Sequence, residues 1–362
     1  MKVALVYDRV NKWGGAERVL LALHKLFPKA SLFTSVYHTK KADWAKVFDT
    51  KTSFLQKFPI IRSKHEFIPY LMPIAFENFS FDGYDLVISV TSEAAKGIIT
   101  KPGTVHICYC LTPTRYLWSG YDEYFAHPAI KALAKPTVSY LRKWDKQAAQ
   151  RPDHFVAISK EVQGRIKKYY DLDASVIYPP VTLPIPKTNT KRTKKASGYF
   201  LVVSRLSQFT KYKRIDLAIE ACNILQLPLK IVGEGSWEKE LKSKAGPTIE
   251  FLGNVTDEEL ITYYQNSKAL IFPAKEDFGL TIIEAQSFGK PVIAFRGGGA
   301  QETIIEGKTG YFFDQQTVAA LVTALQDFDK FSFDPKASRK QAEKFSEEKF
   351  RKQFLSLVKK LI

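Results

Sequence analysis

Short apolar, β-branched runs alternate with helical patterns along the chain, and this alternation limits the possible folds more than any other feature. In the first half, five runs have the composition of strands: residues 3–8, 30–37, 85–91, 104–110 and 154–159. Helical patterns at residues 16–27 and 128–150 separate some of them. Continuous apolar runs that alternate with helices are typical of parallel strands buried on both faces. We therefore expect a doubly wound α/β domain.

The alternation stops once, at residues 179–197, where prolines and lysines follow one another without periodicity. Beyond this stretch five further runs resemble strands: residues 199–204, 229–233, 249–253, 269–274 and 291–295. We predict a Rossmann-like domain over residues 1–180, a linker over 181–197 and a second Rossmann-like domain over 198–344. Open α/β sheets bind ligands at the carboxyl ends of their strands, so two such domains facing one another predict a site in a central cleft.

The last segment, residues 345–362, carries apolar side chains at helical spacing. An amphipathic helix of this kind docks on a domain or lies on a membrane, and we expect this one to pack back on the N-terminal domain. No apolar run reaches the roughly 18 to 20 residues that a membrane-spanning helix requires. The first residues have the pattern of a strand and not of a signal peptide, so we expect a cytoplasmic protein.

Cysteine and histidine spacing predicts neither a disulfide framework nor a metal site. We interpret Cys108, Cys110 and Cys222 as reduced core residues, since three cysteines cannot form a four-ligand zinc site. The six histidines are scattered along the chain, and the Asp-Leu-Asp loop at residues 171–173 is interpreted as solvated. We therefore expect no metal and no cofactor.

The net charge of +17 indicates an anionic partner. Residues 1–180 hold 26 Lys and Arg against 16 Asp and Glu, which is +10, and the remainder of the chain carries +7. Nucleic acid is not expected, because no recognised binding module is present. Residues 54–76 mix aromatic residues, prolines and cations, and they form either a packed irregular segment or a docking surface for an anionic membrane. The second alternative would place the protein peripherally on the inner face of the cell membrane.

Two carboxylates, Glu276 and Glu284, flank a Phe-Gly-Leu turn in an apolar setting. Thr281 and Glu284 fit the capping-box pattern of a helix start, which gives Glu284 a structural role. Glu276 is predicted at the carboxyl end of a strand, where capping does not explain it. The backbone N–H groups of Gly279 and Leu280, at the start of a helix, would face an anion.

Cations are predicted at the strand ends of the same domain. Arg205 follows a strand, while Lys211, Lys213 and Arg214 precede the next helix. A solvated basic loop is the simpler interpretation of these residues alone. Together with the turn between Glu276 and Glu284, they resemble a clamp for a diphosphate.

These residues carry a family resemblance. The segment KEDFGLTIIEA, residues 275–285, resembles the E-x7-E motif of retaining glycosyltransferases of family 4, which have the two-domain GT-B fold. The similarity extends in order to GGAERVL, FDGYDLVIS, TPTRYLW, VIYPPV, VGEG, FLGNV, GKPVIAFRGGGAQE and GKTGYFF, so it covers nearly the whole chain. GGAER with TPTRYLW is most similar to the WbaZ-like mannosyltransferase branch, whose members build bacterial surface polysaccharides.

The resemblance implies a role for each matching residue. Arg205 and Lys213 would neutralise the leaving nucleoside diphosphate, with Lys211 as the alternative to Lys213. Glu276 would position the hydroxyls of the donor sugar, and Glu284 would hold the ribose. The remaining donor-binding residues are Phe278, Gly279 and Leu280 through their backbone, Gly233, Leu252, Gly253, Asn254 and Val255 at the base, and Gly14 and Gly15 over the diphosphate.

The acceptor side is implied to include Thr112, Arg115 and Tyr116. Many relatives have a histidine two residues before the proline of this stretch, where this chain has Leu111. His106 is not expected to replace it, because strand residues five apart face opposite sides. The family mechanism is front-face transfer with retention, in which no protein nucleophile and no metal take part.

Together the sequence predicts a retaining hexosyltransferase that uses a sugar nucleotide, with GDP-mannose as the expected donor and a glycan or lipid-linked acceptor. A UDP-sugar-dependent relative and a non-catalytic sugar-nucleotide or glycan-binding relative remain alternatives. A nucleotide-dependent dehydrogenase is not favoured, because residues 8–18 lack the G-x-G-x-x-G spacing.

Overall fold

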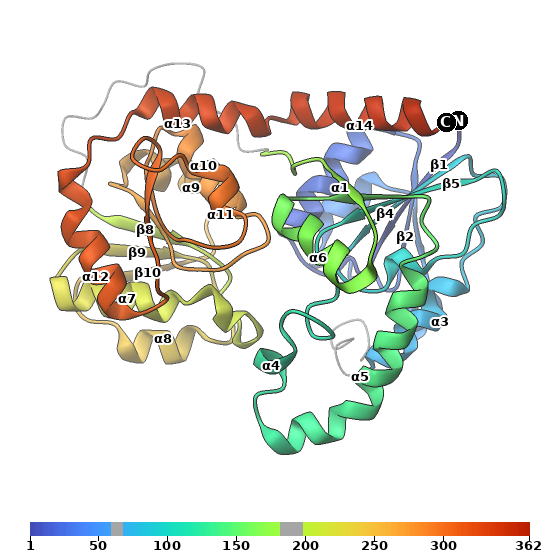
Figure 1. The fold of residues 1–362 in the computed structure, drawn as a ribbon, viewed down its shortest axis with the longest axis horizontal. Helices are drawn as coiled ribbons and strands as arrows, with labels where there is room; N and C mark the ends of the chain where they lie inside the picture. Colours follow the sequence, from blue (N-terminus) through green and yellow to red (C-terminus); the bar gives the residue numbers. More distant parts are fainter. Residues whose placement is uncertain (59–67, 182–197) are drawn as a thin grey trace. The chain divides into compact units, whose positions relative to one another are not determined.

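The computed structural model describes residues 1–58, 68–181 and 198–362. By contacts the chain divides into two compact units (Figure 1). Unit 1 comprises Met1–Pro180 and Glu347–Ile362, and unit 2 comprises Val181–Ser346. The predicted linker lies outside the described residues except for Val181.

The described residues of unit 1 form a sheet of seven parallel strands in the order β3-β2-β1-β4-β5-β6-β7. Its strands are β1 (Val3–Tyr7), β2 (Ser31–Thr34), β3 (Thr50–Thr52), β4 (Leu86–Thr91), β5 (Val105–Cys110), β6 (His154–Ala157) and β7 (Ala174–Val176). The central strands β1 and β4 are buried along their whole length, because their continuous apolar sequences pack on both faces.

Helices cover this sheet, and α5, which has 21 residues, extends beyond it (Figure 1). The helices are α1 (Gly15–Leu26), α3 (Met72–Glu77), α4 (Tyr121–Tyr124), α5 (Pro128–Ala148), α6 (Lys160–Tyr170) and α14 (Glu347–Leu361). The last of these returns to unit 1: the ring of Phe350 packs edge-on against Tyr109 of β5 at 5.9 Å, and Lys25 of α1 pairs with Glu347 at 2.8 Å. Three buried side chains, Phe350, Phe354 and Val358, supply its apolar face.

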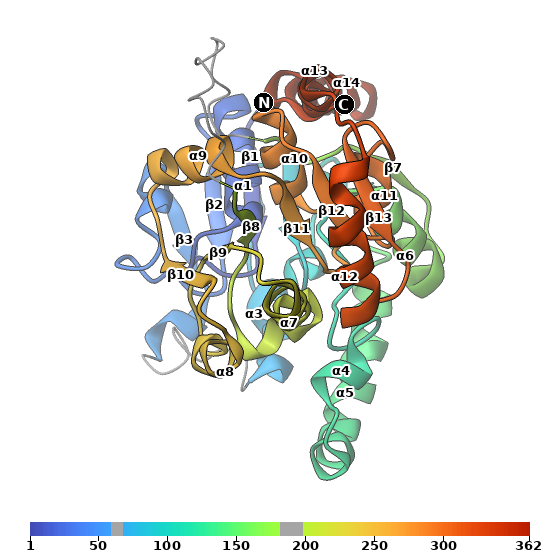
Figure 2. The ribbon, with the colours of Figure 1, turned by 90° about the vertical axis from the view of Figure 1, so that its left-hand side faces the viewer.

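The described residues of unit 2 form a sheet of six parallel strands in the order β10-β9-β8-β11-β12-β13. The strands are β8 (Phe200–Val203), β9 (Leu229–Val232), β10 (Ile249–Gly253), β11 (Leu270–Phe272), β12 (Val292–Phe295) and β13 (Gly310–Phe313). The helices are α7 (Ile215–Leu225), α8 (Glu238–Lys244), α9 (Asp257–Asn266), α10 (Leu280–Ser287), α11 (Ala300–Thr303), α12 (Val318–Asp327) and α13 (Pro335–Ala342). Figure 2 shows α7 and α12 side by side against this sheet.

Each sheet has one point where the strand order reverses. In unit 1 the chain runs outward from β1 to β2 and β3, and then resumes at β4 on the other side of β1. In unit 2 the same reversal separates β8 from β11. The loops that leave two such strands turn to opposite faces, so a crevice forms at their carboxyl ends. These two places are where the fold favours ligand binding.

Three strands were not predicted from the sequence, namely β3, β7 and β13. The first two are edge strands of three residues, and their Thr-Lys-Thr and Ala-Ser-Val sequences contain no apolar run to mark them. Edge strands are buried less and so need less apolar sequence. The sequence of β13, Gly-Tyr-Phe-Phe, belongs to a family motif, and its single short run did not by itself predict a strand.

Candidate active site

The carboxyl ends of β8 and β11 bring together the predicted diphosphate-binding residues of unit 2. Arg205 follows β8 by two residues and its side chain is exposed. Glu276 lies in the loop after β11 and is partly buried. Both residues therefore lie at the reversal of strand order, where the sheet favours a ligand.

Lys213 pairs with Glu276 directly. It ends a short 3-10 helix, Gln208–Lys213, and its Nζ lies 2.5 Å from Oε1 of Glu276. The two side chains are 14% and 22% exposed. Lys211, the other candidate, turns away to pair with Glu240 at 3.0 Å and lies over the ring of Trp237. The two lysines thus have different ion-pair partners, and the assignment of Lys213 to the diphosphate stays a prediction.

Glycine residues fix the turn that follows Glu276. Gly279 has φ +88°, and a Cβ there would lie 2.9 Å from Cδ1 of Ile282, so only glycine fits without strain. A second glycine loop, at residues 297–299, holds the turn from the other side. The N–H of Gly299 donates to the carbonyl of Glu276 at 3.0 Å, and a Cβ on Gly298 would lie 2.1 Å from the same oxygen. Sequence reasoning noted these glycines as a motif but not this contact.

The predicted capping box at Thr281 and Glu284 is wrong. The helix α10 begins at Leu280, its N-cap is Gly279, and no side chain caps it. Thr281 is therefore the second residue of the helix, two positions beyond the N-cap, and cannot act as the cap. Glu284 is instead buried, and its Oε2 accepts a hydrogen bond from the hydroxyl of Tyr264 at 2.8 Å. The capping argument, which had given Glu284 a structural role, no longer applies.

The residues predicted to line the base pocket lie at the ends of β9 and β10. Gly233 donates its N–H to the carbonyl of Gly253 at 2.8 Å. A Cβ on Gly233 would lie 1.9 Å from the carbonyl oxygen of Ser204, so this close approach requires glycine. Leu252 and Val255 are partly buried and Asn254 is exposed. Phe278 is buried and Leu280 partly buried in the neighbouring turn.

Unit 1 holds a second ion pair at its own reversal of strand order. Arg9 follows β1, Glu93 follows β4, and Nη1 and Oε1 of these residues lie 2.6 Å apart, with exposures of 14% and 18%. Gly14 is the N-cap of α1 and Gly15 is its first residue. The sequence analysis did not predict Arg9 and Glu93 as site residues. Each comes two residues after a buried strand, and that position could have indicated a place at the carboxyl edge of the sheet.

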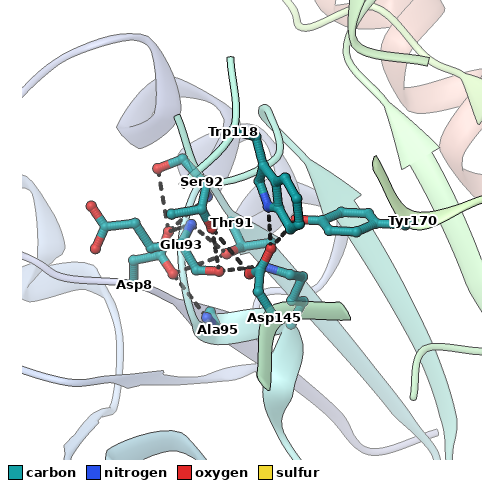
Figure 3. A network of polar contacts seen from close by, with 10 residues as sticks. Asp8, Thr91, Ser92, Glu93, Ala95, Trp118, Asp145 and Tyr170 are labelled. Carbon is teal, nitrogen blue, oxygen red and sulfur yellow. Dashed lines mark hydrogen bonds and ion pairs between the residues drawn. The ribbon is translucent and has the colours of Figure 1, made fainter. Parts of the chain in front are cut away.

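Buried Asp8 holds the loop that carries Glu93. Its carboxylate accepts hydrogen bonds from the hydroxyl of Thr91 and from the backbone N–H groups of Ser92, Glu93 and Ala95 (Figure 3). Burial, together with the charge of Glu93, raises the pKa of Asp8. The buried carboxylate has no water to bind and is satisfied by these donors instead, so the hydrogen bonds hold the loop in place.

A second buried carboxylate, Asp145 of α5, supports the stretch after β5. It accepts from the hydroxyl of Tyr170 and the indole N–H of Trp118, each at 2.7 Å, and pairs with the buried Lys96 at 2.5 Å (Figure 3). Although burial alone lowers the pKa of Lys96, the charge and hydrogen bond of Asp145 raise it above its ordinary value. The Trp118 contact anchors the end of the predicted acceptor-side stretch.

The predicted acceptor-side residues lie upstream of Trp118. Thr112 is buried and its hydroxyl accepts from Arg165 at 3.2 Å, while Arg115 and Tyr116 are partly buried. His106 does not join them: it is buried in β5, bonded to Ser89 at 2.8 Å, and burial lowers its pKa to about 3. No His, Cys, Asp or Glu cluster suited to a metal occurs in the described ranges. Cys108, Cys110 and Cys222 are free thiols in the core.

The solved structure of HepE from Anabaena in complex with UDP-glucose has the same fold. The two chains align over their full lengths with a TM-score of 0.72 and 20% identity. At this identity the likeness concerns the fold alone. With the two parallel sheets described above, it identifies the chain as a GT-B protein of two Rossmann-like domains and confirms the predicted fold class.

Sequence comparison gives a partial family match. Residues 187–349 match the family model described as "Glycosyl transferases group 1". The D-rhamnosyltransferase WbpZ of Pseudomonas aeruginosa is 29% identical over 206 residues, which cover 54% of this chain and 52% of WbpZ. A GDP-mannose-dependent α-(1-6)-phosphatidylinositol monomannoside mannosyltransferase of Mycolicibacterium smegmatis is 31% identical over 144 residues. This match covers 35% of this chain and 38% of that relative. The matches thus span about half or less of these two relatives.

Proposed function

We propose that the protein is a retaining glycosyltransferase that moves a hexose from a sugar nucleotide to a hydroxyl of a glycan or lipid-linked acceptor. The observation that carries the proposal is the grouping of Arg205, Lys213 and Glu276 where the strand order of unit 2 reverses. The group 1 family match over the same unit supports it. Fold alone would not, because one fold serves many activities.

In the proposed reaction the bond between the anomeric carbon and the diphosphate oxygen breaks, and the acceptor oxygen bonds to that carbon from the same face. The acceptor proton passes to the departing phosphate oxygen. Arg205 and Lys213 stabilise the charge that develops on this diphosphate. Glu276, released from Lys213, accepts hydrogen bonds from sugar hydroxyls. Neither a metal nor a protein nucleophile takes part.

GDP-mannose is the proposed donor. The proposal rests on the resemblance to the WbaZ-like branch and on the GDP-mannose-dependent relative from Mycolicibacterium smegmatis. UDP sugars are the alternative, favoured by the UDP-glucose complex of HepE. The backbone around residues 252–255, at the end of β10, is the proposed contact of the base.

Titration calorimetry with GDP-mannose, UDP-glucose, UDP-N-acetylglucosamine and UDP-galactose tests the donor. GDP-mannose is expected to bind most tightly, with binding reduced at least about tenfold in Arg205→Ala, since hydrogen bonds to charged groups contribute about 1.5–3 kcal/mol. Tight binding of a UDP sugar alone would overturn the donor assignment. Absence of binding by all four would overturn the proposed function.

A non-catalytic sugar-nucleotide or glycan-binding role is the second candidate, favoured by Leu111 in place of the histidine of many relatives. The two roles differ in turnover, because a binder does not release the nucleoside diphosphate. Slow hydrolysis of the bound donor, in which water takes the sugar and the nucleoside diphosphate leaves, is expected of the transferase and should be abolished in Glu276→Ala. The proposed setting is the cytoplasmic face of a bacterial membrane, on a surface polysaccharide or glycolipid. Within the described residues, the helices are too short or too polar to cross a lipid bilayer.

A further inference from the structure

A hollow between α4 and α5 is lined by three cations. Its volume is about 520 Å³, which is within the range of ligand pockets. Lys131, Lys135 and Arg142 line it, and their spacings of four and seven residues place them along one side of α5. Among the described residues of the lining there is no carboxylate. Figures 1 and 2 show α4 beside α5 in unit 1.

Arg142 is held in place at this hollow. Its Nε donates a hydrogen bond to the carbonyl of Leu117 at 2.6 Å. Its guanidinium carbon lies 4.6 Å from the ring centre of Tyr121 and 5.4 Å from that of Trp118. Within the described part of the chain Arg142 forms no other hydrogen bond, so its Nη groups keep their donors for a ligand. A guanidinium fixed in this way loses little conformational entropy on binding, and its planar fork suits carboxylate or phosphate.

The two lysines are not neutralised by strong ion pairs. Lys131 pairs with Asp122 at 2.6 Å, but the side chain of Asp122 is 84% exposed, and exposed ion pairs contribute little. Lys135 is exposed and forms no ion pair with any residue that the structure describes. Exposed lysines alone are expected on a chain with a net charge of +17. Two of them beside an arginine that two rings and a carbonyl hold in place are a more specific arrangement.

The hollow adjoins the predicted acceptor side of unit 1. Leu117 and Trp118, which hold Arg142, directly follow Tyr116 in the chain. The ring of Tyr116 in turn lies 6.3 Å from that of Tyr124, the last residue of α4. A ligand in the hollow would therefore lie next to the residues assigned to the acceptor.

We propose that this hollow binds an acidic segment of the glycan acceptor, with carboxylate or phosphate substituents of the sugar chain at Lys131, Lys135 and Arg142. The proposal rests on the proposed function, because it concerns the acceptor of that reaction. Charge decides the class of ligand, since a neutral glycan would leave the cations unused. A second copy of this chain, also at +17, would bring charges of the same sign.

A lipid bilayer fits the hollow less well than a glycan. At about 100° per residue, the exposed apolar residues of α5, Ile130, Leu133 and Tyr140, lie on the other side of the helix from its lining cations. A flat surface cannot contact both sides at once. The membrane-docking surface predicted from sequence, residues 54–76, is a different segment, and residues 59–67 of it lie outside the described residues.

Titration calorimetry at roughly 0.05 M salt tests the proposal, because more salt would screen exposed charges. The probes are trigalacturonate, which carries carboxylates, pentamannose 6-phosphate, which carries a phosphate, and uncharged maltotriose. We expect at least one acidic probe to bind and maltotriose not to bind. The acidic probe that binds more tightly identifies the substituent as carboxylate or phosphate.

Variants of the lining locate the binding. Lys131→Gln with Lys135→Gln should weaken it about 5- to 25-fold, since each exposed ion pair contributes up to about fivefold. Arg142→Lys should weaken it about tenfold, because lysine keeps the charge but not the planar fork. Glutamine keeps helix propensity high, and circular dichroism checks the folding of each variant.

A matched pair on α13 controls for the loss of charge. Lys336→Gln with Lys340→Gln removes two exposed cations at the same spacing in unit 2. This pair should change the affinity less than about twofold, because distant exposed charges are screened.

The proposal fails if neither acidic probe binds, if maltotriose binds as tightly, or if the control pair weakens binding as much as the α5 pair does. It also fails if phosphatidylglycerol vesicles, and neither acidic probe, bind in a way that the α5 pair abolishes. In that case the hollow belongs to a lipid surface. Calorimetry with GDP-mannose on the same variants should show unchanged donor affinity. If an acidic probe binds but none of the sugar nucleotides does, the proposed function is wrong and the acidic-glycan site remains.

Discussion

Replacing Glu276 by glutamine should have opposite effects on binding and on turnover. The carboxylate pairs with Lys213 at 2.5 Å in the ligand-free protein, and the same lysine is proposed to bind the diphosphate of the donor. A nucleoside diphosphate must therefore draw Lys213 away from Glu276. Glutamine keeps the shape of the side chain but removes the competing charge. We expect Glu276→Gln to bind a nucleoside diphosphate without sugar more tightly, and to lose transfer.

The size of the effect follows from the burial of the pair. Exposed ion pairs contribute about 0–1 kcal/mol. Two unit charges 4 Å apart interact with about 4 kcal/mol at an effective dielectric constant of 20. With side chains 14% and 22% exposed, the pair lies between these limits. A contribution of about 1–2 kcal/mol corresponds to about 5–30-fold tighter binding of the diphosphate in Glu276→Gln.

The measurement is calorimetry with GDP and with UDP at fixed ionic strength. Glu250→Gln is the matched control, because Glu250 forms the Lys230 ion pair elsewhere in unit 2 and its loss changes the net charge equally. The control should change affinity less than about twofold, since Glu250 is more exposed. Lys213→Ala should weaken binding in both backgrounds.

The reasoning would be refuted if Glu276→Gln bound the diphosphate no more tightly than Glu250→Gln does. It would also be refuted if the tighter binding persisted when Lys213 was alanine, because the gain is assigned to release of that lysine.

Three further predictions concern stability and the ribose. Gly279→Ala should lower the free energy of unfolding by about 2–3 kcal/mol in urea titrations, from left-handed backbone strain and crowding, while Gly164→Ala, in open helical space, should not lower it. The pKa of His106, about 3 in the folded protein, lies below the ordinary 6.5. The stability of the folded protein that depends on neutral His106 is therefore fully present above pH 6.5 and declines as the pH falls. From pH 7 to 5 the unchanged protein should lose about 2 kcal/mol more than His106→Gln does. Tyr264→Phe, which removes the donor to buried Glu284, should cost about 1–3 kcal/mol of stability and weaken nucleotide binding in calorimetry.

The fold class could be predicted because its determinants are local. Buried parallel strands such as β1 and β4 require continuous apolar sequence, and such runs can be recognised in the sequence alone. The edge strands β3 and β7 could not be predicted, since each has only three residues and none of them is buried, which leaves no apolar pattern. The reversal of strand order is invisible in the sequence, because it depends on which strands pair and not on where they lie along the chain.

The candidate site could be predicted in its residue types but not in its contacts. Spacing predicts that either Lys211 or Lys213 binds phosphate. Their different partners could not be predicted, because the turn of the 3-10 helix directs Lys211 to Glu240 and Lys213 to Glu276. The capping-box pattern failed because the left-handed Gly279 starts α10 earlier than Thr281 would. Arg9 and Glu93 are distant in sequence, and only the pairing of β1 with β4 brings them together.

The final helix has a consequence for synthesis of the protein. Because α14 completes unit 1, whereas Val181–Ser346 form unit 2, the second unit is an insertion within the first. On the ribosome, unit 2 can finish folding while unit 1 still lacks the helix that covers Tyr109. Unit 1 is thus begun first but completed last. Its apolar surface around Tyr109 stays exposed until α14 has been synthesised.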